Sequence, residues 1–210
     1  MPRILTGDSI EAVRAEIGAA AARLYARGGL EAVTMRDLAK VIGRSPMGLY
    51  RYFKTRDEII AYLRADAFTR FSDALEKAFA SGRDAFARAR AVGRAYLDFA
   101  LKNPGAYRLM FDMRQPDDSE YPALAQAAAR ANKTVTRHVI DLAEAGIVSG
   151  DPLMIGQALW AAAHGVIVLH LAGRLPPETS VQDFYIDTMR IAFRGARATA
   201  SRHSRKSATR

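Results

Sequence analysis

The segment that decides the fold spans residues 30–63 and reads LEAVTMRDLAKVIGRSPMGLYRYFKTRDEIIAYL. It contains three helix-start signals close together. Thr34–Asp37 and Thr55–Glu58 each place a hydroxyl three residues before a carboxylate, so the two side chains can satisfy free backbone amides of a first helical turn. Ser45-Pro46 adds an N-cap residue followed by proline at the first helical position. These signals predict three helices that follow one another at short intervals.

A tight turn separates the first two of these helices. Gly43 directly follows Ile42 and can adopt the left-handed conformation that ends a helix. The pattern predicts a helix of about eight residues, a turn, and a second helix of about eight residues that begins after Ser45. Two short helices joined in this way form a helix-turn-helix, whose second helix enters the major groove of DNA.

A longer amphipathic helix precedes the pair. Apolar residues recur there at steps of three and four, namely Ile10, Val13, Ile17, Ala21 and Leu24. Ser9 is the expected N-cap and Gly28-Gly29 the expected stop. This helix is expected to close a three-helix core with the two short ones.

The outward residues of the segment are basic or hydroxyl-bearing. They are Arg36, Arg44, Ser45, Met47, Gly48, Tyr50, Arg51, Tyr52, Lys54 and Arg56. No carboxylate occurs from Arg44 to Arg56, so a phosphate backbone can approach this stretch unopposed. The alternative is a small helical bundle with a solvated basic face.

The charge of the whole chain is concentrated at its two ends. The 210 residues include 31 basic and 22 acidic ones, a net charge of +9, which indicates a polyanionic partner such as nucleic acid or a membrane surface. Residues 1–56 hold 10 basic and 5 acidic residues, 57–193 hold 15 and 17, and 194–210 hold 6 and none. The chain has no cysteine, which excludes a disulfide scaffold, thiol catalysis and Cys-ligated metal sites and fits a reducing cytoplasm.

The rest of the chain shows helical periodicity and almost no strand signals, so the fold class is predicted as all-α with about nine helices. The expected later helices span residues 56–80, 83–102, 103–111, 121–146, 152–172 and 181–196, with a loop at 115–120. The expected domains are a DNA-binding domain at 9–56, a ligand-binding and dimerisation domain at 57–196, and a basic disordered tail at 197–210.

Residues 153–173 carry no formal charge and are long enough to cross a bilayer. Gln157, His164 and His170 interrupt the stretch, and residues 1–8 contain no signal peptide, so no membrane association is expected. An apolar helix of this kind must be covered on two sides. We expect a homodimer through helices 152–172 and 181–196, while burial of that face against helix 121–146 of the same chain is the alternative.

The N-terminal motif resembles the DNA-binding domain of the tetracycline-repressor (TetR) family. The resemblance covers about residues 9–60 and rests on Gly29–Thr34, Leu38-Ala39, Gly43, Ser45, Leu49–Lys54, Asp57 and Glu58. It implies a dimeric bacterial transcription regulator, usually a repressor, with phosphate contacts from Thr34, Tyr50, Tyr52, Lys54 and Arg56. It also implies that Arg36, Arg44, Ser45 and Met47 face bases. Gly48 and the basic tail depart from the family pattern.

Two later motifs, Asn103–Phe111 and Trp160–Gly165, resemble a subgroup of this family whose last domain carries a Trp and a His-Gly on one helix. Trp160 and His164 are one helical turn apart and are therefore neighbours. An expected ligand site consists of Tyr96, Phe99, Tyr107, Met110, Phe111, Trp160 and His164. Ordinary core packing is the alternative for each of them.

The sequence contains no catalytic constellation: it lacks His-x-x-x-His and Glu-x-x-His pairs, a phosphate loop and a Gly-x-Ser-x-Gly elbow. We therefore expect no enzyme, no cofactor and no metal. The predicted function is a cytoplasmic, ligand-responsive, dimeric repressor of a palindromic operator, released by a small, largely apolar effector. The alternatives are an activator or architectural DNA-binding protein, and a helical domain with enzymatic or carrier activity.

Overall fold

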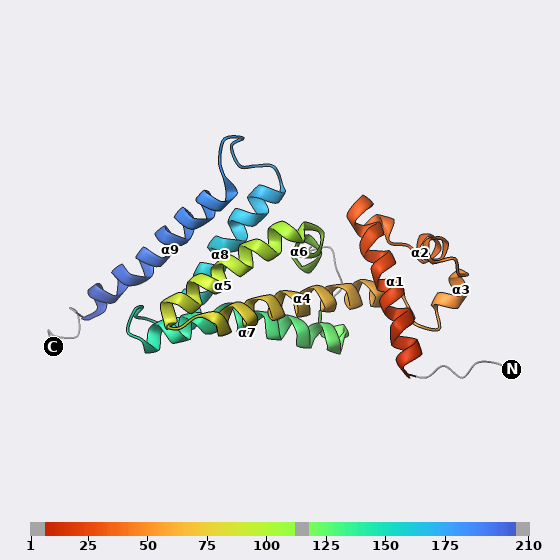
Figure 1. Cartoon of the computed structure of the whole chain (residues 1–210), viewed down its shortest axis with the longest axis horizontal. Coiled ribbons are helices and arrows are strands. Elements are labelled where there is room, and N and C mark those ends of the chain that lie inside the picture. Colours follow the sequence, from red (N-terminus) through yellow and green to blue (C-terminus); the bar gives the residue numbers. More distant parts are fainter. Residues whose placement is uncertain (1–6, 112–117, 205–210) are drawn as a thin grey trace. The chain divides into compact units, whose positions relative to one another are not determined.

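The computed structural model describes residues 7–111 and 118–204, and every regular element in these ranges is a helix (Figure 1). The elements are α1 (Gly7–Gly28), η1 (Leu30–Ala32), α2 (Met35–Ile42), α3 (Pro46–Leu49), α4 (Arg56–Ser81), α5 (Ala85–Lys102), α6 (Pro104–Phe111), η2 (Asp118–Glu120), α7 (Pro122–Glu144), α8 (Pro152–Leu171) and α9 (Val181–Ser204). The prediction of an all-α fold with nine α-helices is confirmed over the described ranges.

The chain divides into two compact units. The first consists of Met1–Thr69 and Gly105–Ala128, and the second of Arg70–Pro104 and Ala129–Arg210. The first unit extends beyond residue 56, the expected end of the DNA-binding domain. It does so because Ile59, Ile60 and Leu63 at the start of α4 pack into the same core as α1, α2 and α3.

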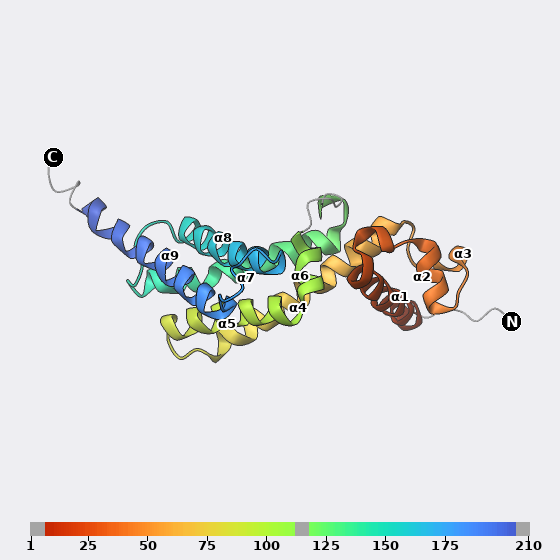
Figure 2. The same cartoon turned by 90° about the horizontal axis from the view of Figure 1, so that it is seen from above.

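Apolar side chains of α1, η1, α2, α3 and the start of α4 build most of the core of the first unit. Figure 2 shows α1, α2 and α3 grouped together. The fully buried side chains of this core include Ile17, Leu38, Leu49, Phe53, Ile59 and Ile60. Each aliphatic side chain buried in this way stabilises the fold by about 1.5–3 kcal/mol relative to exposure. The helices α2 and α3 thus pack into one core with α1 and the start of α4.

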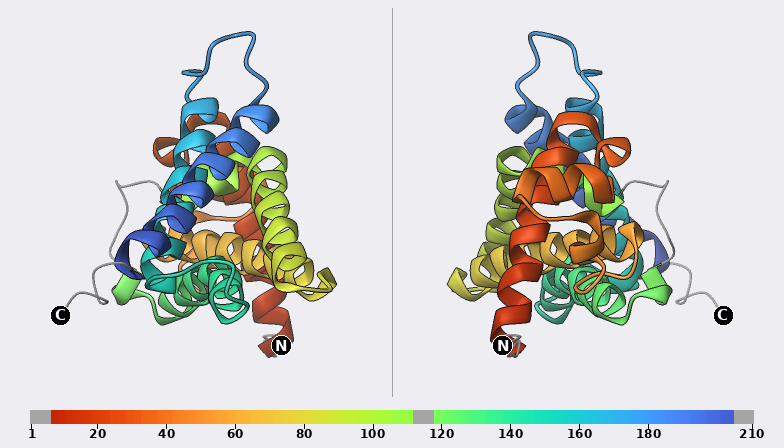
Figure 3. Two further views of the ribbon diagram at one scale, coloured as in Figure 1. Left: turned by 90° about the vertical axis from the view of Figure 1, so that its left-hand side faces the viewer. Right: turned by 90° about the vertical axis from the view of Figure 1, so that its right-hand side faces the viewer.

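In the second unit α8 packs against α9, and residues 172–180 connect the two (Figure 3). Tyr185 of α9 is buried, and its hydroxyl donates a hydrogen bond of 3.0 Å to the carbonyl of Gly93 on α5. Gly156 lets α8 approach α7 closely, because a Cβ there would lie 3.1 Å from Cγ2 of Thr136. Among the described helices, α8 alone is long and apolar enough by composition to cross a membrane.

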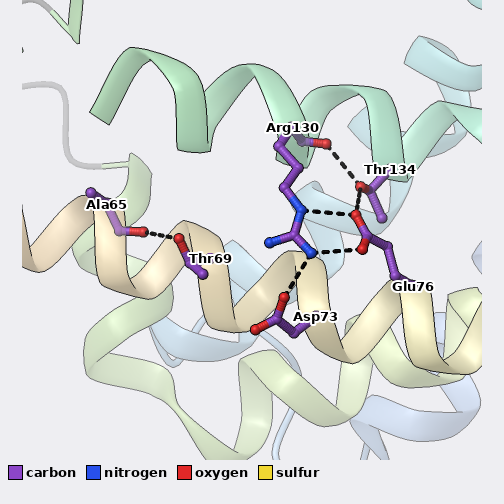
Figure 4. Close-up of polar contacts among 6 residues, drawn as sticks. All are labelled: Ala65, Thr69, Asp73, Glu76, Arg130 and Thr134. Carbon is purple, nitrogen blue, oxygen red and sulfur yellow. Dashed lines mark hydrogen bonds and ion pairs between the residues drawn. The ribbon is translucent and has the colours of Figure 1, made fainter. Parts of the chain in front are cut away.

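An ion-pair network joins α4 to α7 within the second unit (Figure 4). Arg130 donates to both carboxylate oxygens of Glu76, over 3.0 and 2.6 Å, and to Asp73 over 2.7 Å. The hydroxyl of Thr134 donates to Glu76 over 3.1 Å. The hydrogen bonds from Arg130 lower the pKa of Glu76 below its ordinary value.

Two expectations about helix starts and lengths in the first unit were wrong. The helix α1 begins at Gly7, so Ser9 lies inside it and is not the N-cap. The helix α3 spans Pro46–Leu49, four residues instead of about eight. After it the amides of Tyr52 and Phe53 both donate to the carbonyl of Leu49, over 2.9 and 3.1 Å, and the chain continues as a turn.

Two expectations about irregular segments also require correction. Residues 118–120 form a 3-10 helix instead of a loop, and residues 112–117 lie outside the described ranges. The helix α9 continues to Ser204, so residues 197–204 of the expected disordered tail are helical, whereas 205–210 lie outside the described ranges. Residues 197–204 contain neither glycine nor proline to end the helix.

Candidate nucleic-acid interface and effector site

The two short helices are capped as their sequence predicts. Thr34 has extended backbone angles, and its hydroxyl accepts a hydrogen bond of 3.1 Å from the amide of Asp37. The same hydroxyl donates to the Asp37 carboxylate over 2.6 Å. Gly43 ends α2 in the left-handed conformation, with φ of 66°. The expected turn residues therefore occupy the expected conformations.

The cap of α3 involves the amide of Gly48. Ser45 accepts a hydrogen bond of 3.1 Å from the amide of Gly48, and Pro46 occupies the first helical position. A Cβ at Gly48 would lie 3.3 Å from the Ser45 hydroxyl oxygen, a tight contact. A side chain at residue 48 would require the Ser45 hydroxyl to shift by a few tenths of an ångström.

Most of the predicted DNA-contacting residues lie on the exposed side of α2, α3 and the turn after α3. The exposed ones are Arg36, Arg44, Ser45, Met47, Tyr50 and Lys54. Met47 is 77% exposed and Tyr50 48% exposed, although both are large and apolar in part. Lys40 and Arg51 are exposed alongside them; Arg51 was expected to face outward without an assigned contact, and Lys40 was not singled out. Together these side chains form a surface rich in hydrogen-bond donors.

Besides the cap residues Thr34 and Ser45, three further predicted contact residues are engaged within the first unit. Tyr52 is buried in the core. Arg44 forms an ion pair of 3.3 Å with Glu16 of α1. Arg56 is only 36% exposed and donates from Nε to the carbonyl of Val33 over 2.6 Å. Their contacts with DNA stay predictions.

A residue that sequence reasoning missed lies behind this surface. The guanidinium of Arg14 on α1 stacks over the ring of Phe53, 4.2 Å from its centroid, and donates to the carbonyl of Tyr52 over 2.7 Å. It also lies 3.4 Å from Glu58. Its one local partner is Glu11, 3.9 Å away, whereas Tyr52 and Glu58 are 38 and 44 residues away in the sequence, so no local pattern marks Arg14.

Four of the seven predicted effector residues meet in the second unit. The indole N–H of Trp160 donates to the hydroxyl of Tyr96 over 3.1 Å, and the rings of Trp160 and His164 are 5.9 Å apart. Phe71 makes edge contacts with both Tyr96 and Phe99, at centroid distances of 5.3 and 5.2 Å. The result is an aromatic cluster with a few polar tips.

The other three predicted effector residues belong to the first unit. Tyr107 and Met110 are buried, and Phe111 contacts Tyr107 and Phe68 at centroid distances of 5.0 and 6.0 Å. The predicted set is therefore divided between the two compact units.

Two surface grooves of the second unit have other linings. One, of about 410 Å³, is lined by Ala78, Ala87, Arg90, Ala91, Arg94, Ala95 and Asp98. The other, of about 780 Å³, is lined by Ala129, Asn132, Lys133, Thr136, Arg137, Ile140, Asp141 and Leu153. Neither groove includes a predicted effector residue.

Burial favours the neutral forms of two histidines and one tyrosine in the second unit. It lowers the pKa of His164 and lowers the pKa of His138 to about 4. It also raises the pKa of Tyr185, and the nearby Tyr96 adds to this effect. Within the described ranges, no group of three His, Asp or Glu side chains could hold a metal ion.

Asp118 has a structural role that the sequence did not indicate. It lies in the segment 115–120, which was expected to be a loop and of which residues 115–117 lie outside the described ranges. The Asp118 carboxylate instead lies 2.6 Å from the guanidinium of Arg64, a buried residue of α4. Arg64 also donates to the carbonyl of Met110 over 3.3 Å, so it joins α4 to α6 and η2.

Models of known protein families match both the N-terminal and the C-terminal part of the chain. A family model of bacterial regulatory proteins of the tetR family matches residues 17–63, and one of the tetracyclin repressor-like C-terminal domain matches residues 89–191. The HTH-type transcriptional regulator Rv1816 of Mycobacterium tuberculosis (strain H37Rv) is 27% identical over 149 residues, which are 69% of this chain and 61% of that protein. The chain thus spans less than two thirds of this relative.

Solved structures share the fold over most of the chain. A protein of unknown function from Rhodococcus sp. RHA1 has a TM-score of 0.78 at 24% identity, covering 94% of this chain and all of that one. The TetR family regulator PfmR from Thermus thermophilus has a TM-score of 0.67 at 20% identity, covering 85% of this chain and 97% of that one. From the capped helix pair, the helical second unit and the two family matches, we conclude that the chain belongs to the TetR family of DNA-binding transcriptional regulators.

Proposed function

We propose that this chain is a dimeric repressor that binds a palindromic operator and leaves it when a small, largely apolar effector binds. The observation that carries the proposal is the exposed basic face of the capped helix pair, with Arg36, Tyr50 and Lys54 at the surface and no carboxylate in the sequence from Arg44 to Arg56. Donors spread over such a face can contact phosphates while the short helix contacts base edges.

Exposed apolar side chains on α8 and α9 support a dimer. They are Leu153, Met154, Val168, Leu169, Phe184, Ile186 and Ile191, each 38–70% exposed. The small residues Ala158 and Ala161 are also exposed on α8 and would allow a second helix to come close. A partner copy that covered this face would form a four-helix bundle with two-fold symmetry, which matches the symmetry of a palindrome.

The aromatic cluster around Trp160 supports an effector site in the second unit. Tyr96, Trp160 and His164 offer hydrogen-bonding tips on apolar rings, a composition typical of small-molecule sites. The resemblance to a subgroup with a Trp and a His-Gly on one helix supports the same location. An effector would release DNA only by binding one conformation of the dimer more tightly than the other.

A titration of labelled DNA tests the proposal. The full chain is added to a duplex from the intergenic region upstream of its own gene and to a scrambled duplex of equal length and composition. We expect affinity for the upstream duplex to exceed that for the scrambled one by about 10³-fold or more at physiological salt. Equal affinities would contradict the proposal and favour a carrier or enzyme whose basic ends serve solubility.

A further inference from the structure

We propose that Arg56 and Arg14 are positioning residues that hold the two ends of the helix-turn-helix in place, and that neither serves as a phosphate contact. The inference rests on the proposed DNA-binding function. It reassigns Arg56, which the sequence had placed among the residues that touch phosphates. Both arginines act within the first unit.

Arg56 fixes the entrance to the helix pair. It lies at the start of α4, and its Nε donates to the carbonyl of Val33 over 2.6 Å while one Nη donates to the carbonyl of Leu30. The other Nη lies 3.6 Å from Asp57. All three nitrogens of the guanidinium therefore have partners inside the protein.

The two carbonyls that Arg56 contacts belong to the connection between α1 and α2. Leu30 begins η1, and Val33 is the last residue before Thr34, the N-cap of α2. The direction of a helix as short as α2 depends on the conformation of the connection that precedes it, residues 30–34. The fork of Arg56 thus ties the start of α2 to the start of α4.

Arg14 fixes the exit from the helix pair. Its guanidinium donates to the carbonyl of Tyr52 over 2.7 Å, in the turn that follows α3, and stacks 4.2 Å from the centroid of Phe53. It also pairs with Glu58 over 3.4 Å, and Glu58 accepts a hydrogen bond of 2.6 Å from the amide of Lys54. Arg14 thereby joins α1, the turn after α3 and the first turn of α4.

The chemistry of these contacts predicts how each arginine responds to substitution. A phosphate contact needs mainly a positive charge, which lysine retains. A planar fork that bonds two carbonyls, or stacks on a ring while it donates, cannot be replaced by a lysine ammonium. Arginine-to-lysine substitutions therefore separate positioning from phosphate contact at each site.

The experiment compares Arg56→Lys, Arg56→Ala and Arg14→Lys with the wild-type full chain. Two matched variants of an exposed arginine, Arg51→Lys and Arg51→Ala, are the controls. The DNA probes are the duplex most enriched from a random pool by the wild-type chain and its scrambled version. Affinity is measured at several salt concentrations. Amide hydrogen exchange of the free proteins is followed in the peptides that cover residues 30–36 and 50–55.

We expect Arg56→Lys and Arg14→Lys to weaken binding to the selected duplex about tenfold or more, since each loses a charge-assisted hydrogen bond. The salt slope and the affinity for the scrambled duplex should stay near the wild-type values. Exchange should speed up in residues 30–36 for Arg56→Lys and in residues 50–55 for Arg14→Lys. Arg51→Lys should resemble the wild type, and Arg51→Ala should reduce the salt slope by about 0.9.

The inference is overturned if the lysine variants match the wild type in affinity and exchange, or if Arg56→Ala lowers the salt slope as Arg51→Ala does. Should the lysine variants not fold, phenylglyoxal modification of the wild type decides: DNA should protect Arg51 but leave the slow modification of Arg56 and Arg14 unchanged. If the wild type does not distinguish the duplexes, the proposed function fails, and the exchange data on the free proteins still test the positioning.

Discussion

Trp160 donates its indole N–H to the hydroxyl of Tyr96 over 3.1 Å, and this hydrogen bond joins α8 to α5 within the second unit. Trp160 is the single tryptophan of the sequence, so tryptophan fluorescence reports on the surroundings of this one side chain. Tyr96 is buried and also packs edge-on against Phe71 of α4. The pair therefore connects three helices of the unit that is proposed to bind the effector.

Tyr96→Phe should remove the acceptor and leave the indole N–H without that partner. We expect the free energy of unfolding to fall by about 0.5–1.5 kcal/mol and the tryptophan emission of the folded protein to change. Urea unfolding followed by fluorescence measures both. Tyr50→Phe, at an exposed position of the first unit, is the control and should change neither the free energy of unfolding nor the emission. A Tyr96→Phe variant with the stability and the emission of the wild type would contradict the contact.

His138 should make stability depend on pH. Burial lowers its pKa to about 4, from an ordinary value of 6.5, so between these values the unfolded chain binds a proton that the folded chain does not. The folded state is therefore destabilised as the pH falls from 6.5 toward 4, and above pH 6.5 this loss is absent. Between pH 7.5 and 4.5, the free energy of unfolding of the wild type should fall by about 1–3 kcal/mol more than that of His138→Leu. Parallel pH profiles for the two proteins would contradict this.

Substitutions on the exposed basic face should separate two kinds of DNA contact. Tyr50→Phe and Lys54→Ala are expected to weaken binding about equally on all sequences, because phosphate contacts carry no sequence information. Arg36→Ala and Arg44→Ala should also relax base preference, by about 1–3 kcal/mol per lost contact. Titrations against single-base variants of the selected duplex measure this. Loss of one specific base preference in Lys54→Ala would reverse the assignment.

The proposed dimer interface can be tested at an exposed alanine of α8. Ala161→Arg would place a charge in the apolar face and should yield a folded monomer, because the unpaired charge would be costly to bury. Sedimentation velocity gives the mass, and circular dichroism checks the fold. Ala80→Arg, at an exposed position near the end of α4, is the matched control and should remain dimeric. A dimer of unchanged stability in Ala161→Arg would place the interface elsewhere.

The features that sequence predicted well are local ones. Thr34, Gly43 and Ser45 act on amides and carbonyls only a few residues away, so their caps follow from spacing alone. Helical periodicity likewise gave the later helices to within a few residues, because each depends on one repeating apolar face. The end of α9 was missed because its last residues have no apolar period yet contain nothing that stops a helix.

The features that sequence could not predict depend on distant partners. Arg56 and Val33 are 23 residues apart, and Arg14 and Tyr52 are 38 apart, so nothing in the local pattern distinguishes these arginines from exposed ones such as Arg51. The same holds for Asp118, whose role depends on Arg64. Composition showed that basic residues are concentrated in the helix-turn-helix segment. It could not indicate which of them have partners inside the protein.

Selection of duplexes from a random pool by the full-length chain tests the central claim most directly. The account predicts enrichment of an inverted repeat whose half-sites are centred about 10 base pairs, or a multiple of that, apart, since two recognition helices related by two-fold symmetry must meet successive major grooves. Absence of any enriched sequence, or enrichment of a single half-site without symmetry, would contradict it.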